Sequence, residues 1–214
     1  MTLEPVVWTI LVAAGSASRF GRDKLAETVV HDRSVLDIAI SAASESSTGV
    51  VVVCAPGSDM PTDARHELVY VVGGRTRSES VRCGLAAVPE HADVVVVHDA
   101  ARPLADRSVY GRVIEAVSAG HDGAIPVVDV VDTIRSVDGR VLDREQLRAV
   151  QTPQAFRASV LREAHARGGE ATDDASLVEA AGGEIVLVDG DVRSLKITRP
   201  ADLVMVRAFL HEIL

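Results

Sequence analysis

The sequence predicts an α/β fold built on a doubly wound, mostly parallel sheet, and two observations lead to this prediction. Hydrophobic residues make up 47% of the 214 residues but aromatic residues only 3%. A core would therefore consist of valine, alanine, leucine and isoleucine, as in parallel strands buried on both faces. Apolar runs of strand length also alternate with helical patterns along the chain, which is the order of βαβ units. The length fits a single domain over residues 1–214.

The first half of the chain follows this alternation closely. Residues 6–14 are a continuous apolar run, typical of a central strand. Ser34 and Asp37 match a capping box in front of a helical pattern. Another helix is expected to begin at Ser78, after a glycine pair, and to end before Pro89. Further strands are expected at 50–54, 68–72, 94–97 and 124–128, and a further helix at about 106–119.

The second half departs from the alternation. Apolar residues on both sides of Asp138-Gly139 predict a hairpin, and we expect an arm at about 130–148 to project and pack on another subunit. A helical stretch is expected from Gln151 to the glycines at 168–169, and Thr172 is expected to cap the next helix. Pro200 suits the first turn of a final helix. Residues 185–188 and 192–197 are expected to be short strands.

Charge and cysteine content exclude several classes of function. The chain carries 22 basic and 31 acidic residues, a net charge of -9, so neither nucleic acid nor an anionic membrane is an expected partner. No apolar run has the length of a membrane helix, and no leader pattern is visible. Cys54 and Cys83 show no Cys-x-x-Cys spacing and suit a reduced core. We therefore expect a cytoplasmic protein.

Residues 10–24 have the composition of a phosphate-binding loop. The apolar run ends at Gly15, small residues follow, and cations stand at positions 19, 22 and 24. Five residues separate Gly15 from Gly21, which excludes a Walker loop. Ala17 stands where a dinucleotide fingerprint that begins at Gly15 requires its second glycine. The alternative is an ordinary turn with solvated cations.

A second candidate site follows the strand at 94–97. Asp99 and Arg102 come directly after it and are fixed by Pro103, and in open α/β sheets ligands bind at the carboxyl ends of strands. A structural ion pair is the alternative. For His98, which has no second histidine or cysteine nearby, we expect a packing or hydrogen-bonding role.

The turn after the strand at 68–72 is a third candidate. Gly73 and Gly74 end that strand just before a helix N-terminus, where backbone donors face a ligand. Arg75 and Arg77 lie in this turn, either as ligand contacts or as ordinary exposed arginines.

Seven motifs follow one another along nearly the whole chain. They are Ala13-Ala14-Gly15 with Arg19 and Lys24, Gly73-Gly74-x-x-Arg77-x-x-Ser80-Val81, residues 98–103, Asp132-Thr133-Ile134, Thr152-Pro153-Gln154, residues 172–175 and residues 196–200. Taken together, these motifs resemble those of the 2-C-methyl-D-erythritol 4-phosphate cytidylyltransferase family. The resemblance implies a Rossmann-like nucleotidyltransferase fold and transfer of a cytidylyl group from CTP to that polyol phosphate. It also implies Mg²⁺ or another divalent cation as cofactor, and a homodimer interlocked through the hairpin arm.

The resemblance further implies roles for single residues. The catalytic residues would be Arg19, Lys24, Arg144 and Lys196. The CTP-binding residues would be Ala13, Ala14, Gly15, Gly74, Ser80 and Ala100. The residues that bind the phosphosugar would be Asp99, Arg102, Thr133 and Thr172, with Thr133 and Arg144 supplied by the neighbouring subunit. Asp99 would bind either Mg²⁺ or substrate hydroxyls, and the metal would otherwise be held through CTP phosphates.

Some features depart from the family, and some alternatives stay open. Ala17 stands where the family usually has glycine, and Asp23 precedes Lys24 where the family usually has proline. The acceptor could instead be another polyol phosphate such as ribitol 5-phosphate. A non-catalytic nucleotide-binding module is the alternative from another class, whereas a nicotinamide dehydrogenase would need the missing glycine fingerprint.

Overall fold

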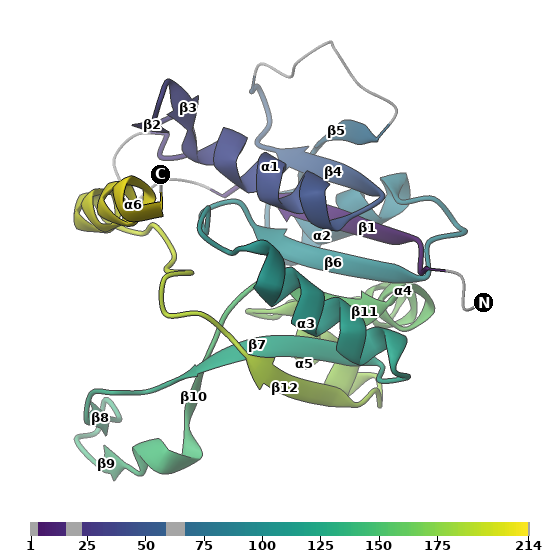
Figure 1. Ribbon diagram of the computed structural model, residues 1–214. Coiled ribbons are helices and arrows are strands. Elements are labelled where there is room, and N and C mark those ends of the chain that lie inside the picture. The colour runs from purple at the N-terminus through teal and green to yellow at the C-terminus, as the bar shows by residue number, and fades with distance from the viewer. Residues whose placement is uncertain (1–3, 16–22, 59–66, 214) are drawn as a thin grey trace.

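A central sheet with helices on both faces forms the body of the protein (Figure 1). This computed structural model describes residues 4–15, 23–58 and 67–213. Within them, eight strands form the main sheet in the order β10-β7-β11-β6-β1-β4-β5, with β12 paired to β7. The predicted α/β class is confirmed.

In chain order the elements are β1 (Val7–Val12), β2 (Thr28–Val30), β3 (Arg33–Ser34), α1 (Val35–Ser46), β4 (Gly49–Cys54), β5 (Leu68–Val72), α2 (Arg77–Ala87), β6 (Val94–Asp99), α3 (Arg107–Ser118), β7 (Gly123–Asp129), β8 (Ile134–Arg135), β9 (Val141–Leu142), η1 (Arg144–Gln146), β10 (Arg148–Val150), β11 (Gln154–Arg157), α4 (Ala158–Ala166), α5 (Asp174–Ala180), β12 (Ile185–Asp189) and α6 (Pro200–Ile213).

Four neighbouring parallel strands, β6, β1, β4 and β5, make one end of the sheet. Ile10 of β1 pairs with Val51 of β4 on one side and with Val97 of β6 on the other, and β5 pairs in parallel with β4. Every residue of β4 and β6 is buried. Strands covered on both faces have no solvent-facing positions, which explains their near-continuous valine runs. The carboxyl ends of β1 and β6 meet at one edge of the sheet, the expected place for a ligand site.

Alternate strand residues enter two separate hydrophobic cores. Val50 and Val52 pack with buried residues of α1, α3 and α6, whereas Val51 and Val53 pack with those of α2, α4 and α5. Successive side chains of a strand point to opposite faces, so each face receives its own layer of helices (Figure 1). The sheet is therefore doubly wound, as predicted.

Two helix caps bear on the predictions. Ser34 and Asp37 form the predicted capping box at the start of α1. The prediction that Thr172 caps the later helix is wrong, because Asp173 accepts the Ser176 backbone N–H at 3.2 Å and α5 begins at Asp174. The Asp173 carboxylate also accepts the Ser176 hydroxyl. Thr172 is exposed just outside the helix.

Two segments have a different structure from the one predicted. Residues 154–157 are not helical but form β11, which pairs antiparallel with β6 and β7 before α4 begins. A short apolar segment fits the helical period and the strand period equally well, and here the pairing with β6 determines that it forms a strand. Residues 192–197 are not a strand, because Asp191 accepts the Arg193 backbone N–H at 2.8 Å and turns the chain. The strand β10 was not predicted at all.

The hairpin arm is present, with shorter strands than the apolar pattern suggested. Ile134 pairs with Leu142 and Arg135 with Val141, and Gly139 has a φ of 92°, which its place in the turn requires. The arm projects away from the sheet (Figure 1), and Val131 and Val137 on it are 79% and 110% exposed. Such exposed apolar side chains are typical of a surface that packs on a partner.

Candidate active site

Two adjoining pockets lie at the carboxyl ends of β1 and β6. The first, here called the glycine pocket, has a volume of about 360 Å³. The second, here called the threonine pocket, has a volume of about 310 Å³. Arg77, Asp99 and Lys196 line both, so they form the boundary at which two bound molecules would meet. The glycine pocket is otherwise lined by Val12, Ala14, Gly15, Lys24, Leu25, Gly74, Arg75, Thr76, Ser80 and Ala101. The threonine pocket is otherwise lined by Arg102, Val150, Gln151, Thr152, Gln154, Thr172, Asp173 and Ser176.

A larger hollow of about 540 Å³ lies elsewhere, along α1 and the amino-terminal ends of β4 and β5. Its charged lining residues are three carboxylates, Asp37, Glu45 and Glu67, and the single cation Arg33. An anionic ligand would be repelled there. The glycine and threonine pockets, which contain the motif residues, are therefore the better candidates for binding an anionic ligand.

The glycine turn between β5 and α2 is closely packed. A Cβ on Gly73 would lie 2.7 Å from the Ala14 Cβ, and a Cβ on Gly74 would lie 2.3 Å from the Glu79 Cβ. The Ser80 hydroxyl accepts the Gly74 N–H at 3.2 Å and donates to the Thr76 carbonyl at 2.8 Å. Ser80, predicted to contact the nucleotide, therefore also fixes the turn that lines the pocket.

Asp99 sits at the boundary of the two pockets between two cations. Lys196 Nζ lies 2.6 Å from its Oδ2 atom, and Arg77 Nε lies 3.3 Å from its Oδ1 atom. Burial by itself would raise the pKa of Asp99, but the charges of Arg77 and Lys196 outweigh it and hold this pKa well below its ordinary value. Asp99 is therefore an anion at neutral pH and aligns both cations.

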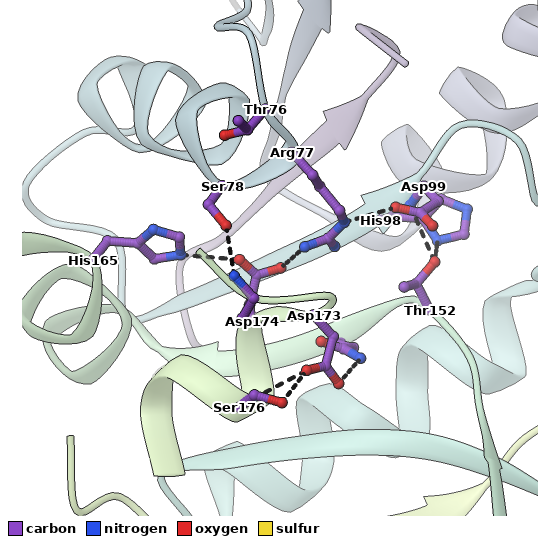
Figure 2. Close-up of polar contacts among 12 residues, drawn as sticks. Thr76, Arg77, Ser78, His98, Asp99, Thr152, His165, Asp173, Asp174 and Ser176 are labelled. Carbon is purple, nitrogen blue, oxygen red and sulfur yellow. Dashed lines mark hydrogen bonds and ion pairs between the residues drawn. The ribbon is translucent and has the colours of Figure 1, made fainter. Parts of the chain in front are cut away.

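Arg77 continues this network into the protein interior. Its Nη1 atom lies 2.7 Å from Asp174 Oδ2, and the other oxygen of Asp174 lies 2.9 Å from His165 Nε2 (Figure 2). Burial opposes the charge of Arg77, but Asp174 and Asp99 outweigh it and raise the pKa of this guanidinium above its ordinary value. Arg77 is thus a fixed cation that connects the two pockets to the core.

His98 has the hydrogen-bonding role expected for it. Its Nδ1 atom lies 3.0 Å from the Thr152 Oγ1 atom, which also accepts the Asp99 N–H at 3.0 Å. Its Nε2 atom lies 3.2 Å from the Arg102 carbonyl oxygen. The ring is 1% exposed, and burial lowers the pKa of His98 from 6.5 to about 4. A neutral His98 and Thr152 therefore hold the backbone on both sides of Asp99.

Two of the predicted catalytic cations, Lys24 and Lys196, line the glycine pocket. Lys24 Nζ donates to the Ile197 carbonyl at 2.8 Å, which brings Lys24 beside the chain segment that carries Lys196. Asp23, the unusual residue before Lys24, accepts the Leu25 N–H at 2.9 Å and so makes a turn there. Arg19 lies outside the described residues.

The remaining predicted residues fall into two groups. Ala14 and Gly15 line the glycine pocket, but Ala13 and Ala100 are buried and do not. Their N–H groups donate to the carbonyls of Val53 and Val12. Both alanine side chains are buried, so they offer no side-chain contact to a nucleotide in this geometry. Their backbone bonds instead hold the edge of the sheet together.

Arg102 and Thr172, two of the residues expected to bind the phosphosugar, both line the threonine pocket. Arg102 Nη1 donates to the Ser194 carbonyl at 2.7 Å, two residues before Lys196. The residues Thr133 and Arg144 line neither pocket of their own chain. Arg144 Nη1 instead donates to the Val131 carbonyl at 2.6 Å within the arm.

Several residues of the site have roles that the sequence did not predict. In the sequence, Arg77 could equally be an ordinary exposed arginine, and Asp174 could be an acidic residue that favours the first turn of a helix. The structure instead pairs the two side chains. The Gly-Gly-x-x-Arg motif was the available signal for Arg77. No local pattern pointed to His165, because its contact with Asp174 arises from the packing of α4 against α5.

The described residues offer no ready-made metal site. Among them, no three histidine, cysteine, aspartate or glutamate side chains gather closely enough to hold a metal ion. Both oxygens of Asp99 already face cations. A divalent cation at this place would therefore depend mainly on phosphate oxygens of a ligand, as is common for Mg²⁺. No helix in the described part of the chain is long and apolar enough to cross a membrane.

Comparisons with known proteins agree with this geometry. The family model described as 2-C-methyl-D-erythritol 4-phosphate cytidylyltransferase (IspD) matches residues 7–212. The protein of that name from Rhodococcus jostii is 42% identical over 97% of this chain and 96% of its own length. A bifunctional enzyme IspD/IspF from Solidesulfovibrio magneticus is 40% identical over 92% of this chain, and the match spans only 55% of that longer protein. The crystal structure of 2-C-methyl-D-erythritol 4-phosphate cytidylyltransferase from Thermus thermophilus has a TM-score of 0.83 and 36% identity, covering 98% of this chain and 100% of that one.

Proposed function

Because this chain belongs to the 2-C-methyl-D-erythritol 4-phosphate cytidylyltransferase family, we propose that it transfers the cytidylyl group of CTP to 2-C-methyl-D-erythritol 4-phosphate. The products are 4-(cytidine 5'-diphospho)-2-C-methyl-D-erythritol and pyrophosphate. One observation in the structure carries the proposal, namely the two pockets that share Arg77, Asp99 and Lys196. Such an arrangement holds two anionic molecules on either side of one charged boundary.

The composition of each pocket supports a different substrate for it. The glycine pocket has backbone at Gly15 and Gly74 and the cation Lys24, which suits a triphosphate. The threonine pocket has hydroxyl groups of Thr172 and Ser176 beside Arg102, which suits a polyol phosphate. The α-phosphorus of CTP would then lie near Lys196, at the boundary.

The proposed reaction needs no side-chain base. The acceptor phosphate is already anionic, and one of its oxygens forms a bond to the α-phosphorus while the bond to the β-phosphate oxygen breaks. The electron pair of the broken bond leaves with pyrophosphate. The barrier lies in repulsion between anions and in charge that develops on the α-phosphate, so fixed cations are the main requirement. Lys24, Lys196 and the proposed Arg19 supply that charge, and Asp99 aligns Lys196.

We propose that Mg²⁺, or another divalent cation, enters with the CTP phosphates. When bound, it would neutralise part of the triphosphate charge. Asp99 would contribute to it only by releasing Lys196 or Arg77 from its carboxylate, and we therefore favour a role for Asp99 toward substrate hydroxyls and cations.

We also propose a homodimer in which each arm completes the site of the other subunit. Arg144 and Thr133 lie on the arm, outside both pockets of their own chain, and the arm exposes Val131 and Val137. A mixture of Arg144→Ala and Lys196→Met chains tests this. Exchange would form heterodimers with one intact site and recover up to about a quarter of the wild-type rate. Two inactive variants whose mixture stays inactive, despite proven subunit exchange, would contradict the shared site.

The remaining proposals concern organisation and location. We propose that residues 1–214 form a single nucleotidyltransferase domain whose arm spans about 130–148, since the family match covers 7–212. We propose a cytoplasmic location, because Cys54 and Cys83 are free thiols and such thiols persist in a reducing compartment.

A pyrophosphate-release assay tests the function. CTP, ATP and UTP are each combined with 2-C-methyl-D-erythritol 4-phosphate and with ribitol 5-phosphate, in the presence of Mg²⁺. We expect release with CTP and the methylerythritol phosphate. Release with ribitol 5-phosphate alone would assign another acceptor, and an absence of release with every pair would leave a non-catalytic nucleotide-binding module. Lys196→Met serves as the control for contaminating activity.

A further inference from the structure

His165 and Asp174 lie behind the active site and are not substrate contacts in the proposed reaction. Asp174 is 0% and His165 4% exposed. Figure 2 shows Asp174 between His165 and Arg77, with Asp99 beyond Arg77. The contacts form one unbroken series from Lys196 through Asp99, Arg77 and Asp174 to His165.

We propose that His165 and Asp174 are positioning residues, which fix Arg77 and thereby the Asp99 carboxylate at the boundary of the two pockets. The inference rests on the proposed function of that site. A buried carboxylate has its orientation determined by its donors, and Asp174 receives Arg77 on Oδ2 and His165 on Oδ1. Replacing the His165 donor by an apolar group would leave Oδ1 without that hydrogen bond, and the carboxylate could turn away from Arg77.

The hydrogen-bond inventory determines how His165 acts. The Asp174 carboxylate can only accept, so Nε2 of His165 must carry the proton. Within the described parts of the chain, nothing hydrogen-bonds the buried Nδ1 atom. The ring therefore serves as a single donor aimed at Asp174. A glutamine side chain places an N–H at a similar distance from the backbone, whereas leucine fills the volume without a donor.

The same network also holds the loop that carries Thr172. The Ala171 N–H donates to the Ser78 hydroxyl at 3.3 Å, and Arg82 Nη1 donates to the Gly169 carbonyl at 3.2 Å. These bonds, with the Arg77–Asp174 pair, tie the start of α2 to the residues on both sides of Thr172. Asp174 therefore helps to hold the loop that carries Thr172, and through Arg77 it also orients Asp99.

Kinetics of three variants test the inference. His165→Leu is expected to lower kcat/KM for the phosphosugar on the order of tenfold, the effect of losing one hydrogen bond to a charged group. The KM for CTP should change by less than this factor, because Arg77 is only one of several charged residues that line the glycine pocket. His165→Gln should restore most of the activity. The matched control is Leu161→Ala, a buried position on the same helix whose side chain has no hydrogen-bonding group to offer Asp174. It should lower the melting temperature while leaving the kinetic constants near those of the wild type.

Two further outcomes separate this inference from the proposed function. Crystal structures should show Arg77 moved away from Asp99 in His165→Leu and still paired with it in His165→Gln, whether or not the chain turns over. If the wild type lacks activity but these structures behave as expected, the proposed function fails and the positioning role stands. If Arg77 is unmoved in His165→Leu, or if Leu161→Ala and His165→Leu lose activity equally, the positioning role is overturned.

Discussion

The buried histidine beside Asp99 gives a pH dependence of stability that can be worked out from the structure. His98 is 1% exposed, and burial lowers its pKa from 6.5 to about 4. Between these pH values the unfolded chain binds a proton on His98 that the folded chain does not bind. Because the folded pKa is lowered, the stabilisation is complete above pH 6.5 and is lost as the pH falls toward 4. The pKa difference corresponds to about 3 kcal/mol.

The variant His98→Asn isolates this contribution. It keeps an acceptor near Thr152, but it has no titrating group. The free energy of unfolding is measured with urea at several pH values between 4.5 and 7.5, with Trp8 fluorescence and circular dichroism as probes. The difference between wild type and variant should shrink steadily as the pH falls, by up to ~3 kcal/mol.

A core variant on the same strand provides the control. Val96 is 0% exposed on β6, and Val96→Ala removes volume without a titrating group, so its stability curve should be offset from the wild type by a similar amount at every pH. If the wild type and His98→Asn give parallel curves, the buried neutral histidine inferred here is wrong.

Three further predictions concern the pockets. Gly74→Ala would place a Cβ 2.3 Å from the Glu79 Cβ, so we expect the KM for CTP to rise by roughly tenfold or more, and steady-state kinetics that leave it unchanged would contradict the close packing. Lys196→Met should lower kcat by about 10²- to 10³-fold, by analogy with loss of an oxyanion donor, and a rate within threefold of the wild type would remove Lys196 from catalysis. Asp99→Asn leaves Arg77 and Lys196 without their shared anion, so urea unfolding at pH 7 should show a loss of about 1 to 3 kcal/mol. Unchanged stability would mean that the Asp99 contacts are weak.

The strands β4 and β6 and the cap of α1 could be predicted because local sequence determines them. The valine runs of β4 and β6 are buried on both faces. A short run of β-branched residues strongly favours a strand over a helix. The capping box of Ser34 and Asp37 depends only on residues three apart. Local patterns of this kind do not depend on how the rest of the chain packs.

The features that the sequence did not predict depend on distant partners. β11 exists because Gln154–Arg157 pairs with β6, about sixty residues earlier in the chain. Its composition alone fits the start of α4 equally well. Thr172 resembled a cap, but its neighbour Asp173 has the same capacity and takes the position.

The same distinction applies to the site. Gly74, Asp99 and Lys196 belong to motifs and were predicted, and all three line the pockets. The contact of Arg77 with Asp174 joins residues 97 positions apart, and the one between Asp174 and His165 crosses between two helices. Positioning groups behind an active site are of this kind, since their role depends on packing rather than on a recognisable spacing.

The most direct test is identification of the nucleotide product by ³¹P nuclear magnetic resonance. Wild-type chain, CTP, Mg²⁺ and 2-C-methyl-D-erythritol 4-phosphate should yield pyrophosphate and a compound in which the signal of the acceptor phosphate is split by coupling to a second phosphorus. The free acceptor is a monoester with one phosphorus, so its signal gains this coupling only if its phosphate has bonded to the α-phosphorus of CTP. A spectrum in which the acceptor phosphate signal is unchanged after long incubation, with CTP either intact or merely hydrolysed, would contradict cytidylyl transfer at the boundary of the two pockets.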